Sequence, residues 1–214
     1  RYLTTAARIY KYPFQEQLLI YAQRPDATAC ASIEVWNSRK LNCWVNKGAK
    51  GIALIDEENS YTRLKYVFDV SDVHKARRIG RDPYLWELKQ EQEQSVMKRL
   101  EHIYGETDAE KSFGDRLLEI AESVTNDCYE EVAEDLLYLT DGSFLDGLDE
   151  YSLKVHLRET LRASISYTLL TRCGLDAEDY QDSMNFDFIH EFNTVSVLSQ
   201  LGSNTTELCK PILM

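Results

Sequence analysis

The chain has 214 residues and a formal net charge of −12 at pH 7, and its length allows one or two domains with an ample core. Its five cysteines are odd in number and scattered, with no Cys-x-x-Cys pair. This pattern argues against a disulfide framework or a zinc site and favours a reducing compartment. No apolar stretch reaches transmembrane length and no charged-then-apolar leader is present, so we expect a cytoplasmic protein with no membrane partner.

The charge is distributed unevenly along the chain. Residues 1–81 hold 14 Lys and Arg against 8 Asp and Glu, a net charge of +6, whereas residues 82–214 hold 10 against 28, a net charge of −18. Such an asymmetry suggests two modules with different tasks. We therefore predict a basic module over residues 1–80 and an acidic module over residues 81–214.

Two helices are predicted at the start of the chain, over residues 1–11 and 14–23. In the second, Phe14, Leu18 and Tyr21 recur at spacings of four and three, which places them on one face of a helix. This helix ends before Pro25, because proline disfavours the αR conformation of the residue that precedes it. The small, semi-apolar residues that follow fit either a short strand or a packed loop.

A turn-rich segment, Asn-Lys-Gly-Ala-Lys-Gly at residues 46–51, lies between the apolar runs 41–45 and 52–55. Gly48 and Gly51 adopt positive φ at little cost, so the backbone can double back there. The Val, Ile, Leu and Trp residues of the flanking runs favour strands. We therefore predict a hairpin with this segment at its tip.

The predicted hairpin carries two cations at its tip, Lys47 and Lys50, and an aromatic residue on its first strand, Trp44. A third strand is predicted over residues 64–70, where apolar residues occupy every second position. The three strands would form an antiparallel meander. Residues 1–80 therefore read as an α+β module of two helices and a three-stranded meander.

An ordered set of residues in this module resembles a known family. The set comprises Phe14, Leu18 and Leu19; Gln23-x-Pro25-x-Ala27-Thr28; Trp36; Val45-x-Lys47-Gly48-x-Lys50-Gly51-Ile52; and Val67-Phe68-Asp69-Val70-Ser71. Over about a third of the chain it resembles the N-terminal domain of ArdC-type antirestriction proteins and related modules of large conjugative-element proteins. The resemblance implies a single-stranded-DNA-binding domain that a mobile element carries to protect incoming DNA from host defence.

The chain departs from the ArdC-type pattern in one respect that concerns activity. Proteins of that type carry a metallopeptidase-like domain with an HExxH helix, and this chain has none. His190-Glu191 is followed by Phe192-Asn193-Thr194, so no second histidine stands at the required position. The acidic remainder resembles the helical segment that follows this module in large conjugative-element proteins.

The residue types of the basic module favour the same ligand. Its cations could form one stripe over the meander, where phosphates would replace condensed counterions. Its aromatic residues are candidate stacking platforms, each worth about 1–3 kcal/mol per base: Trp36, Trp44, Tyr61 and Tyr66. Large aromatic residues also pack in cores, which we favour for Trp36 and leave open for Trp44. The predicted site is Trp36, Arg39, Lys40, Trp44, Lys47, Gly48, Lys50, Gly51, Arg63 and Lys65.

Beyond Pro83 the hydrophobic spacing becomes helical. Helices are predicted over residues 84–104, 112–140 and 153–169, with shorter helical pieces over 176–180, 186–192 and 195–201. Gly174 follows the third long helix and is placed to form its C-terminal cap. Acidic residues occupy the faces opposite the apolar positions, so residues 81–214 read as an acidic all-helical module.

No catalytic, cofactor or metal site is predicted. Carboxylates are so dense in the acidic module that pairs of them arise by chance. The segments 141–144 and 146–149 resemble calcium loops but lack the alternating ligands of such loops. His102, His156 and His190 have no Cys or His partner at ligand spacing, and the sequence holds no GxSxG, phosphate-loop or dinucleotide motif.

Two functional hypotheses of different class follow. The first is an accessory protein of a conjugative or phage-like element that binds single-stranded DNA through the basic meander. The second is a protein-binding inhibitor of a host defence nuclease, such as a restriction enzyme or a CRISPR effector, whose acidic helical face imitates a phosphate backbone. Its binding residues would be Glu130, Glu131, Glu134 and Asp135. These acids also fit a solvated face, and the chain also fits a structural domain of a helicase or methyltransferase.

Overall fold

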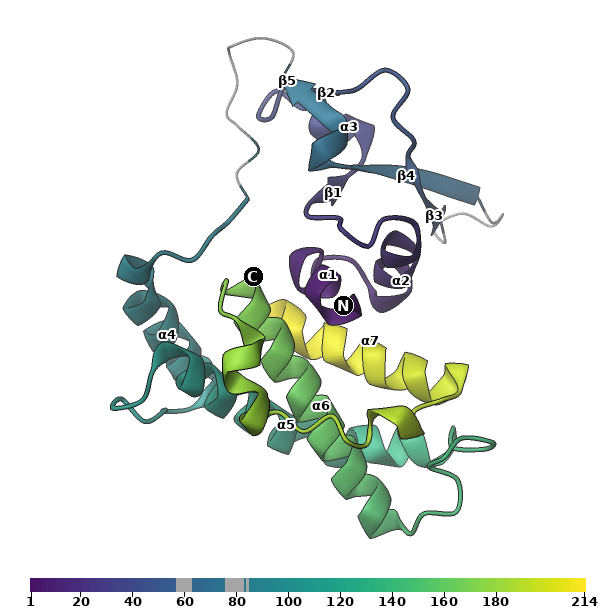
Figure 1. Cartoon of the computed structure of the whole chain (residues 1–214), viewed down its shortest axis with the longest axis vertical. Helices are drawn as coiled ribbons and strands as arrows, with labels where there is room; N and C mark the ends of the chain where they lie inside the picture. The colour runs from purple at the N-terminus through teal and green to yellow at the C-terminus, as the bar shows by residue number, and fades with distance from the viewer. Residues whose placement is uncertain (57–62, 76–82, 84) are drawn as a thin grey trace. The chain divides into compact units, whose positions relative to one another are not determined.

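The computed structural model describes residues 1–56, 63–75, 83 and 85–214. The chain divides into two compact units, Arg1–Trp86 and Glu87–Met214 (Figure 1). The first combines helices with a small antiparallel sheet and the second is helical, which confirms the predicted α+β class. Counted over these units, the charge is +5, from 14 Lys and Arg against 9 Asp and Glu, and −17, from 10 against 27.

The first unit begins with α1 (Tyr2–Arg8) and α2 (Phe14–Gln23), followed by a single helical turn, α3 (Ile33–Trp36). α2 has its predicted bounds. Pro13 is extended just before it, and Arg24, which precedes Pro25, has left the helical conformation at φ −145° and ψ 83°. The hydroxyl of Ser32 caps α3 by accepting the N–H of Val35 at 3.5 Å.

The strands described in this unit are β1 (Cys30–Ala31), β2 (Cys43–Val45), β3 (Ile52–Asp56), β4 (Arg63–Asp69) and β5 (Val73–Lys75), with a 3-10 turn, η1 (Val70–Asp72), before the last. β1, β4 and β3 form an antiparallel sheet in that order. β2 and β5 form a separate two-stranded antiparallel ribbon. The predicted third strand is thus β4, and it lies in the centre of the sheet.

The predicted hairpin over residues 41–55 is wrong, and with it the order of the meander. β2 pairs with β5, where Trp44 lies opposite His74, and β3 pairs with β4. Within residues 46–51 the chain makes one tight turn, closed by the Ala49 N–H bonding to the Asn46 carbonyl at 3.0 Å. It then continues without strand pairing to β3. Six residues exceed the two-residue loops of the tightest hairpins, and strand propensity does not specify a strand's partner.

The core of the first unit lies between α2 and one face of the sheet. Ile20 of α2 is fully buried against Ile52, Leu54 and Val67 of β3 and β4. Because side chains alternate along a strand, the residues between these point to the opposite face. On that outer face Ile55, Leu64 and Tyr66 remain 43%, 59% and 50% exposed.

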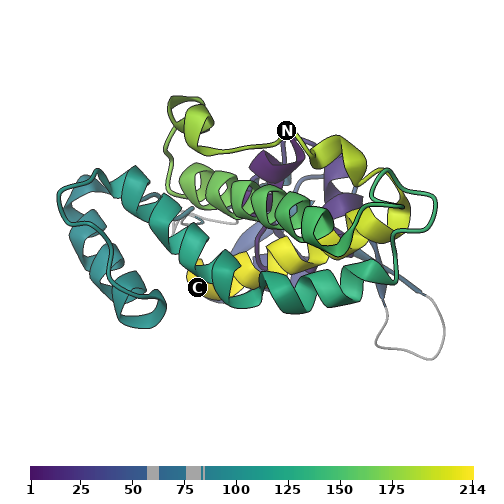
Figure 2. The same ribbon diagram turned by 90° about the horizontal axis from the view of Figure 1, so that it is seen from below.

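The second unit contains α4 (Gln90–Tyr104), α5 (Phe113–Leu137), α6 (Glu150–Arg172) and α7 (Val195–Ile212), with 3-10 turns η2 (Ala177–Ser183) and η3 (Ile189–Glu191). α6 packs against both α5 and α7 (Figure 2). The predicted apolar stripe of α6 is buried in full: Leu153, Leu157, Leu161, Ile165 and Leu169. α7 extends well beyond the predicted 195–201.

Gly174 ends α6 as predicted. Its φ is +78°, its N–H bonds to the Thr171 carbonyl at 3.1 Å, and the N–H of Leu175 bonds to the Leu170 carbonyl at 3.0 Å. This pair of bonds defines a Schellman motif, which requires the left-handed conformation that glycine adopts readily. In the part of the chain that the structure describes, no helix combines the length and the apolar character needed to cross a bilayer.

Candidate nucleic-acid interface

Several residues of the ordered set noted in the sequence hold the first unit together. The carboxylate of Asp69, 2% exposed, accepts the backbone N–H groups of Thr28 and Ala29 at 2.8 and 2.9 Å, and the N–H and hydroxyl of Ser71 at 3.0 and 2.7 Å. Burial acts to raise the pKa of Asp69, but the hydrogen bonds from Ser71, Ala29 and Thr28 outweigh it and leave the pKa below its ordinary value. Asp69 therefore ties the segment after α2 to the end of β4.

Trp36 is a core residue and not a stacking platform. It is 3% exposed, and its indole N–H donates to the Phe68 carbonyl at 2.9 Å. A buried indole with a satisfied N–H is the usual arrangement for tryptophan. The structure thus removes Trp36 from the predicted interface and agrees with the core interpretation that the sequence favoured.

The two glycines of the 46–51 segment have different roles. Gly48 has φ +87° as the third residue of the tight turn, the value that a type II turn requires there. A Cβ on Gly51 would lie 3.0 Å from the Tyr66 Cβ and 3.1 Å from the Phe68 ring. Gly51 is therefore needed for close packing on β4, and it brings the backbone after Lys50 next to the exposed ring of Tyr66.

Trp44 lies on the surface of the β2–β5 ribbon and is 52% exposed. The residue opposite it, His74, is also exposed, and the His74 Nδ1 lies 2.6 Å from the side-chain oxygen of Asn46. Directly paired residues project to the same face of a ribbon. The sequence left the place of Trp44 open and did not predict His74, because its partner strand was assigned wrongly.

The predicted cations do not form one stripe. Arg39, Lys40, Lys47 and Lys50 are exposed in and beside the segments that flank β2. Lys65 instead lies on the α2 side of β4 and forms an ion pair with Glu16 at 2.8 Å. Arg63 alternates in phase with Lys65 on the same strand, so both point away from the outer face that carries Tyr66.

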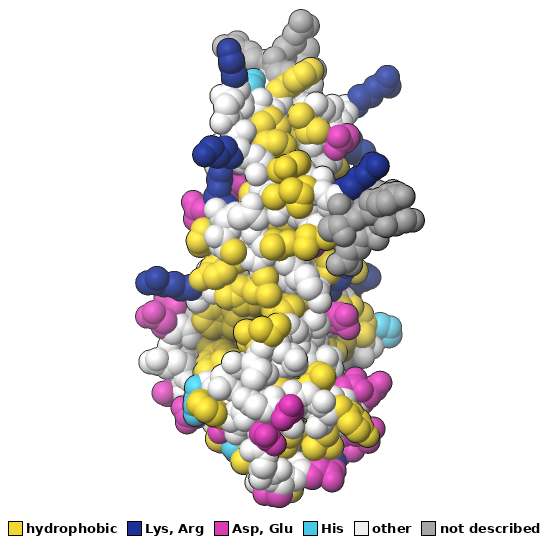
Figure 3. Space-filling view, turned by 90° about the vertical axis from the view of Figure 1, so that its right-hand side faces the viewer, with side chains coloured by type: hydrophobic (Ala, Val, Ile, Leu, Met, Phe, Trp, Pro, Cys, Tyr) yellow, Lys and Arg dark blue, Asp and Glu magenta, His cyan; other side chains and the backbone are white. Residues whose placement is uncertain are grey.

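The four remaining cations have no recorded carboxylate partner within the described ranges. On the face drawn in Figure 3, Lys and Arg side chains border a band of apolar side chains over the first unit, which occupies the upper part of the picture. Tyr61, the last predicted platform, lies outside the described residues. The candidate interface that remains therefore consists of Trp44 and His74, the turn with Lys47 and Lys50, and Tyr66, which lies next to Gly51.

The acidic residues named for the alternative hypothesis lie on one exposed face near the end of α5: Glu130, Glu131, Glu134 and Asp135. Two of them act on a cation of α6. The pKa of Lys154 is raised first by its hydrogen bond to Glu150 and further by the charges of Glu130 and Glu134. Lys154 therefore screens part of this face.

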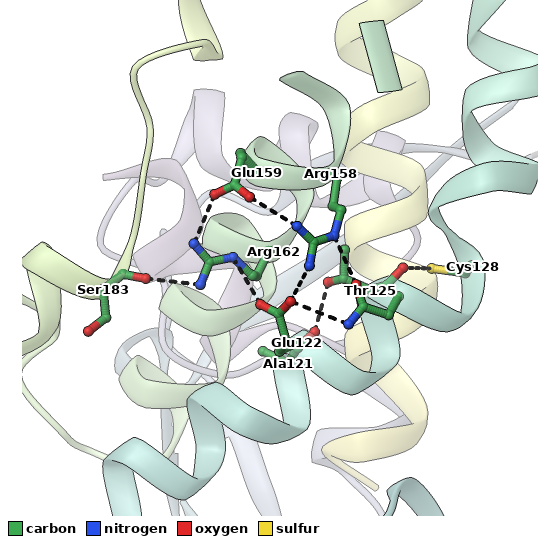
Figure 4. A network of polar contacts seen from close by, with 9 residues as sticks. Ala121, Glu122, Thr125, Cys128, Arg158, Glu159, Arg162 and Ser183 are labelled. Carbon is green, nitrogen blue, oxygen red and sulfur yellow. Dashed lines mark hydrogen bonds and ion pairs between the residues drawn. The ribbon is translucent and has the colours of Figure 1, made fainter. Parts of the chain in front are cut away.

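A second group of charged side chains links α5 to α6 (Figure 4). Glu122 of α5 forms ion pairs with Arg158 and Arg162 of α6, and Glu159 bonds to both arginines at 3.3 and 2.9 Å. Asn126 accepts the Nε–H of Arg158 at 2.9 Å. These charges bind α5 to α6 and leave little capacity for an external ligand.

Comparisons with protein families, curated proteins and solved structures find no match to the chain. The resemblance to ArdC-type domains thus stays a prediction. Within the residues that the structure places, no three His, Cys, Asp or Glu side chains converge to hold a metal ion.

Proposed function

We propose that the first unit binds single-stranded nucleic acid. The resemblance to ArdC-type domains implies that this nucleic acid is DNA. The observation that carries the proposal is Trp44, a half-exposed indole on the strand that leads directly into the turn bearing Lys47 and Lys50. An exposed ring offers a stacking surface for an unpaired base, and nearby cations contact the phosphates on either side of it. Tyr66, beside the end of the same turn, offers a second ring.

A single strand fits this surface better than a duplex. In a duplex the base faces are stacked on each other and are closed to an aromatic side chain, whereas a single strand exposes them. In the first unit the longest described helix, α2, has 10 residues and contains no Lys or Arg, so it presents no cations to a major groove. Protection of incoming DNA from host defence would be the biological role, as the resemblance implies.

The proposal is tested by fluorescence anisotropy of a labelled strand of about 30 nucleotides, titrated at two salt concentrations with duplex as competitor. Trp44→Ala should weaken binding by roughly 5- to 150-fold, because stacking contributes about 1–3 kcal/mol per base. Lys47→Glu/Lys50→Glu should weaken it further at low salt and reduce the magnitude of the slope of log K against log salt by about 1.4, or about 0.7 for each lost phosphate contact.

A matched control is available on the helices of the same unit. Arg8 and Lys11 are exposed on and just after α1, so Arg8→Glu/Lys11→Glu changes the net charge by the same amount away from the ribbon. This control should retain most of the affinity. Equal losses in both double variants would indicate net charge alone, and the absence of binding at low salt would refute the proposal.

A further inference from the structure

The second unit presents an apolar patch at the end where α5 runs into α6. We define this patch as Phe144 of the α5–α6 loop, Ile189 of η3, and Val195 and Leu198 of α7. Their exposed fractions are 65%, 39%, 83% and 45%. Single exposed apolar residues are common on protein surfaces, but a group that comes together from three segments is a candidate interaction site.

Two contacts of Phe144 bring these segments together. The backbone N–H of Phe144 donates to the side-chain oxygen of Asn193 at 2.9 Å, and the rings of Phe144 and His190 lie 6.4 Å apart. Asn193 stands between η3 and the first turn of α7, where Val195 lies. The α5–α6 loop and the start of α7 are on the right of Figure 1, the side that Figure 3 faces.

The patch rests on a fixed support. The hydroxyl of Ser143 donates to the Thr140 carbonyl at 2.6 Å and accepts the N–H of Leu145 at 3.2 Å, so the loop is held on both sides of Phe144. Beneath η3, His156 of α6 is 2.6 Å from the Glu191 carboxylate and stacks on Phe188 at 3.8 Å. A preorganised apolar surface loses little conformational entropy when a partner binds.

The two segments that carry Phe144 and Ile189 have only negative formal charges. Residues 141–150 contain four acids and no Lys or Arg, and residues 185–195 contain two acids and no Lys or Arg. Among these acids, Glu150 pairs with Lys154 and Glu191 with His156. The remaining four acids are exposed: Asp141, Asp146, Asp149 and Asp187.

We propose that this patch binds a protein segment that presents apolar side chains flanked by Lys or Arg. The apolar side chains would cover Phe144 and Val195, and the cations would face the acidic rim, which also guides the encounter. The same rim repels nucleic acids and anionic lipid headgroups, so neither is the occupant. The patch uses none of Glu130, Glu131, Glu134 and Asp135, and the inference is independent of nucleic-acid binding by the first unit.

The test uses the full chain and three labelled synthetic peptides of equal length: an amphipathic Leu/Lys helix, a Ser/Lys peptide of the same charge, and a Leu/Glu helix. Anisotropy is measured at an ionic strength of about 150 mM, where long-range attraction is screened. The Leu/Lys peptide should bind at least tenfold more tightly than the Ser/Lys peptide, and the Leu/Glu helix should not bind. Phe144→Ser/Val195→Ser should lower the affinity for Leu/Lys about tenfold, since it removes the apolar contact and keeps every charge.

Two control variants complete the design. Ile103→Ser changes a residue of α4 that is 58% exposed and outside the patch, and it should leave the affinity unchanged. Asp141→Lys/Asp187→Lys should weaken Leu/Lys binding while Phe144 and Val195 stay in place. Equal affinity for Leu/Lys and Ser/Lys, an undiminished affinity in Phe144→Ser/Val195→Ser, or no binding of Leu/Lys up to about 1 mM would each overturn the proposal.

Discussion

The side-chain amide of Gln23 pairs with the backbone of Ala53 as a neighbouring strand would. Its Nε2 donates to the Ala53 carbonyl and its Oε1 accepts the Ala53 N–H, both at 2.9 Å. Ala53 lies on β3, at the edge of the sheet, where the outward backbone groups face no other strand of the described residues. Gln23 at the end of α2 therefore closes the middle of an edge that would otherwise be open to pairing with another chain.

Gln23→Ala should lower the free energy of unfolding by about 1 kcal/mol, because two neutral hydrogen bonds are lost at a site that water reaches. Gln15→Ala is the matched control. Gln15 is exposed on the same helix, and this variant should change stability by less than about 0.5 kcal/mol. Urea unfolding followed by tryptophan fluorescence measures both. Equal effects of the two substitutions would contradict the role given to Gln23.

Asp69→Asn should destabilise the first unit by about 2–3 kcal/mol, since a charged acceptor of backbone N–H groups is replaced by a neutral amide whose NH₂ cannot accept from Ser71. The pKa of Asp69 is lower in the folded chain than its ordinary value. Its contribution is therefore complete above the ordinary pKa of an aspartate and is lost as the pH falls toward the lower, folded value.

Hydrogen exchange at the amides of Thr28 and Ala29 reports directly on their hydrogen bonds to the Asp69 carboxylate. In the wild type, protection of these amides, corrected for the intrinsic exchange rate, should decrease once the pH falls below about 4, and Asp69→Asn should have low protection at every pH. Asp26→Asn, at an exposed position two residues before Thr28, provides the control. Protection that stays the same in Asp69→Asn would show that the carboxylate does not hold this segment.

How far the sequence predicts the first unit depends on the range of the interactions involved. The bounds of α2 follow from local rules, because Pro13 and Pro25 act on their immediate neighbours. The partner of β2 does not follow from local rules. The 46–51 segment would allow β2 to pair with β3, but β2 pairs instead with β5, about thirty residues further along the chain. The cap at Gly174 is local and was predicted; the Trp44–His74 pair is non-local and was not.

The candidate site shows the same limit. Periodicity identified Lys65 as a cation on a strand, but only the register of β3 and β4 shows that it lies on the α2 side, paired with Glu16. Trp36 and Trp44 are eight positions apart and both lie among polar and apolar residues. Trp36 nevertheless donates its N–H to the Phe68 carbonyl in the core, whereas Trp44 is half exposed. Tertiary contacts determine which of two such residues is buried, and the periodicity of a single sequence does not reveal those contacts.

In the second unit, Glu101 should remain ionised to unusually low pH. Its carboxylate accepts the hydroxyl of Thr107 at 2.6 Å and a guanidinium N–H of Arg116 at 2.7 Å. These two hydrogen bonds, that from Thr107 first, lower the pKa of Glu101 to about 2. Because the folded pKa is below the ordinary value, the contact supports the α4–α5 connection above the ordinary pKa and is lost as the pH falls toward 2.

Carboxyl-detected NMR titration measures this pKa. Thr107→Val should raise it toward the ordinary value of a glutamate, about 4.3, and Arg116→Gln should raise it as well. Asp149, whose pKa is lowered by its hydrogen bonds from Ser152, serves as the internal reference and should titrate alike in all three proteins. A pKa of Glu101 that is unchanged in both variants would mean that the cluster does not persist in solution.

The close approach at Gly51 gives a prediction that separates folding from binding. Gly51→Ala places a methyl group 3.0 Å from the Tyr66 Cβ and 3.1 Å from the Phe68 ring, so β4 or the segment itself must shift, at a cost of about 1–3 kcal/mol. Gly48→Ala meets no atom within 4 Å, and its cost of about 1 kcal/mol comes from the positive φ alone. Urea unfolding should show a larger loss of stability for Gly51→Ala than for Gly48→Ala.

Since Gly51 sets the distance between the turn and the Tyr66 ring, Gly51→Ala should also weaken single-strand binding under conditions where the variant is fully folded. A variant that is destabilised yet binds as the wild type does would place Tyr66 outside the interface.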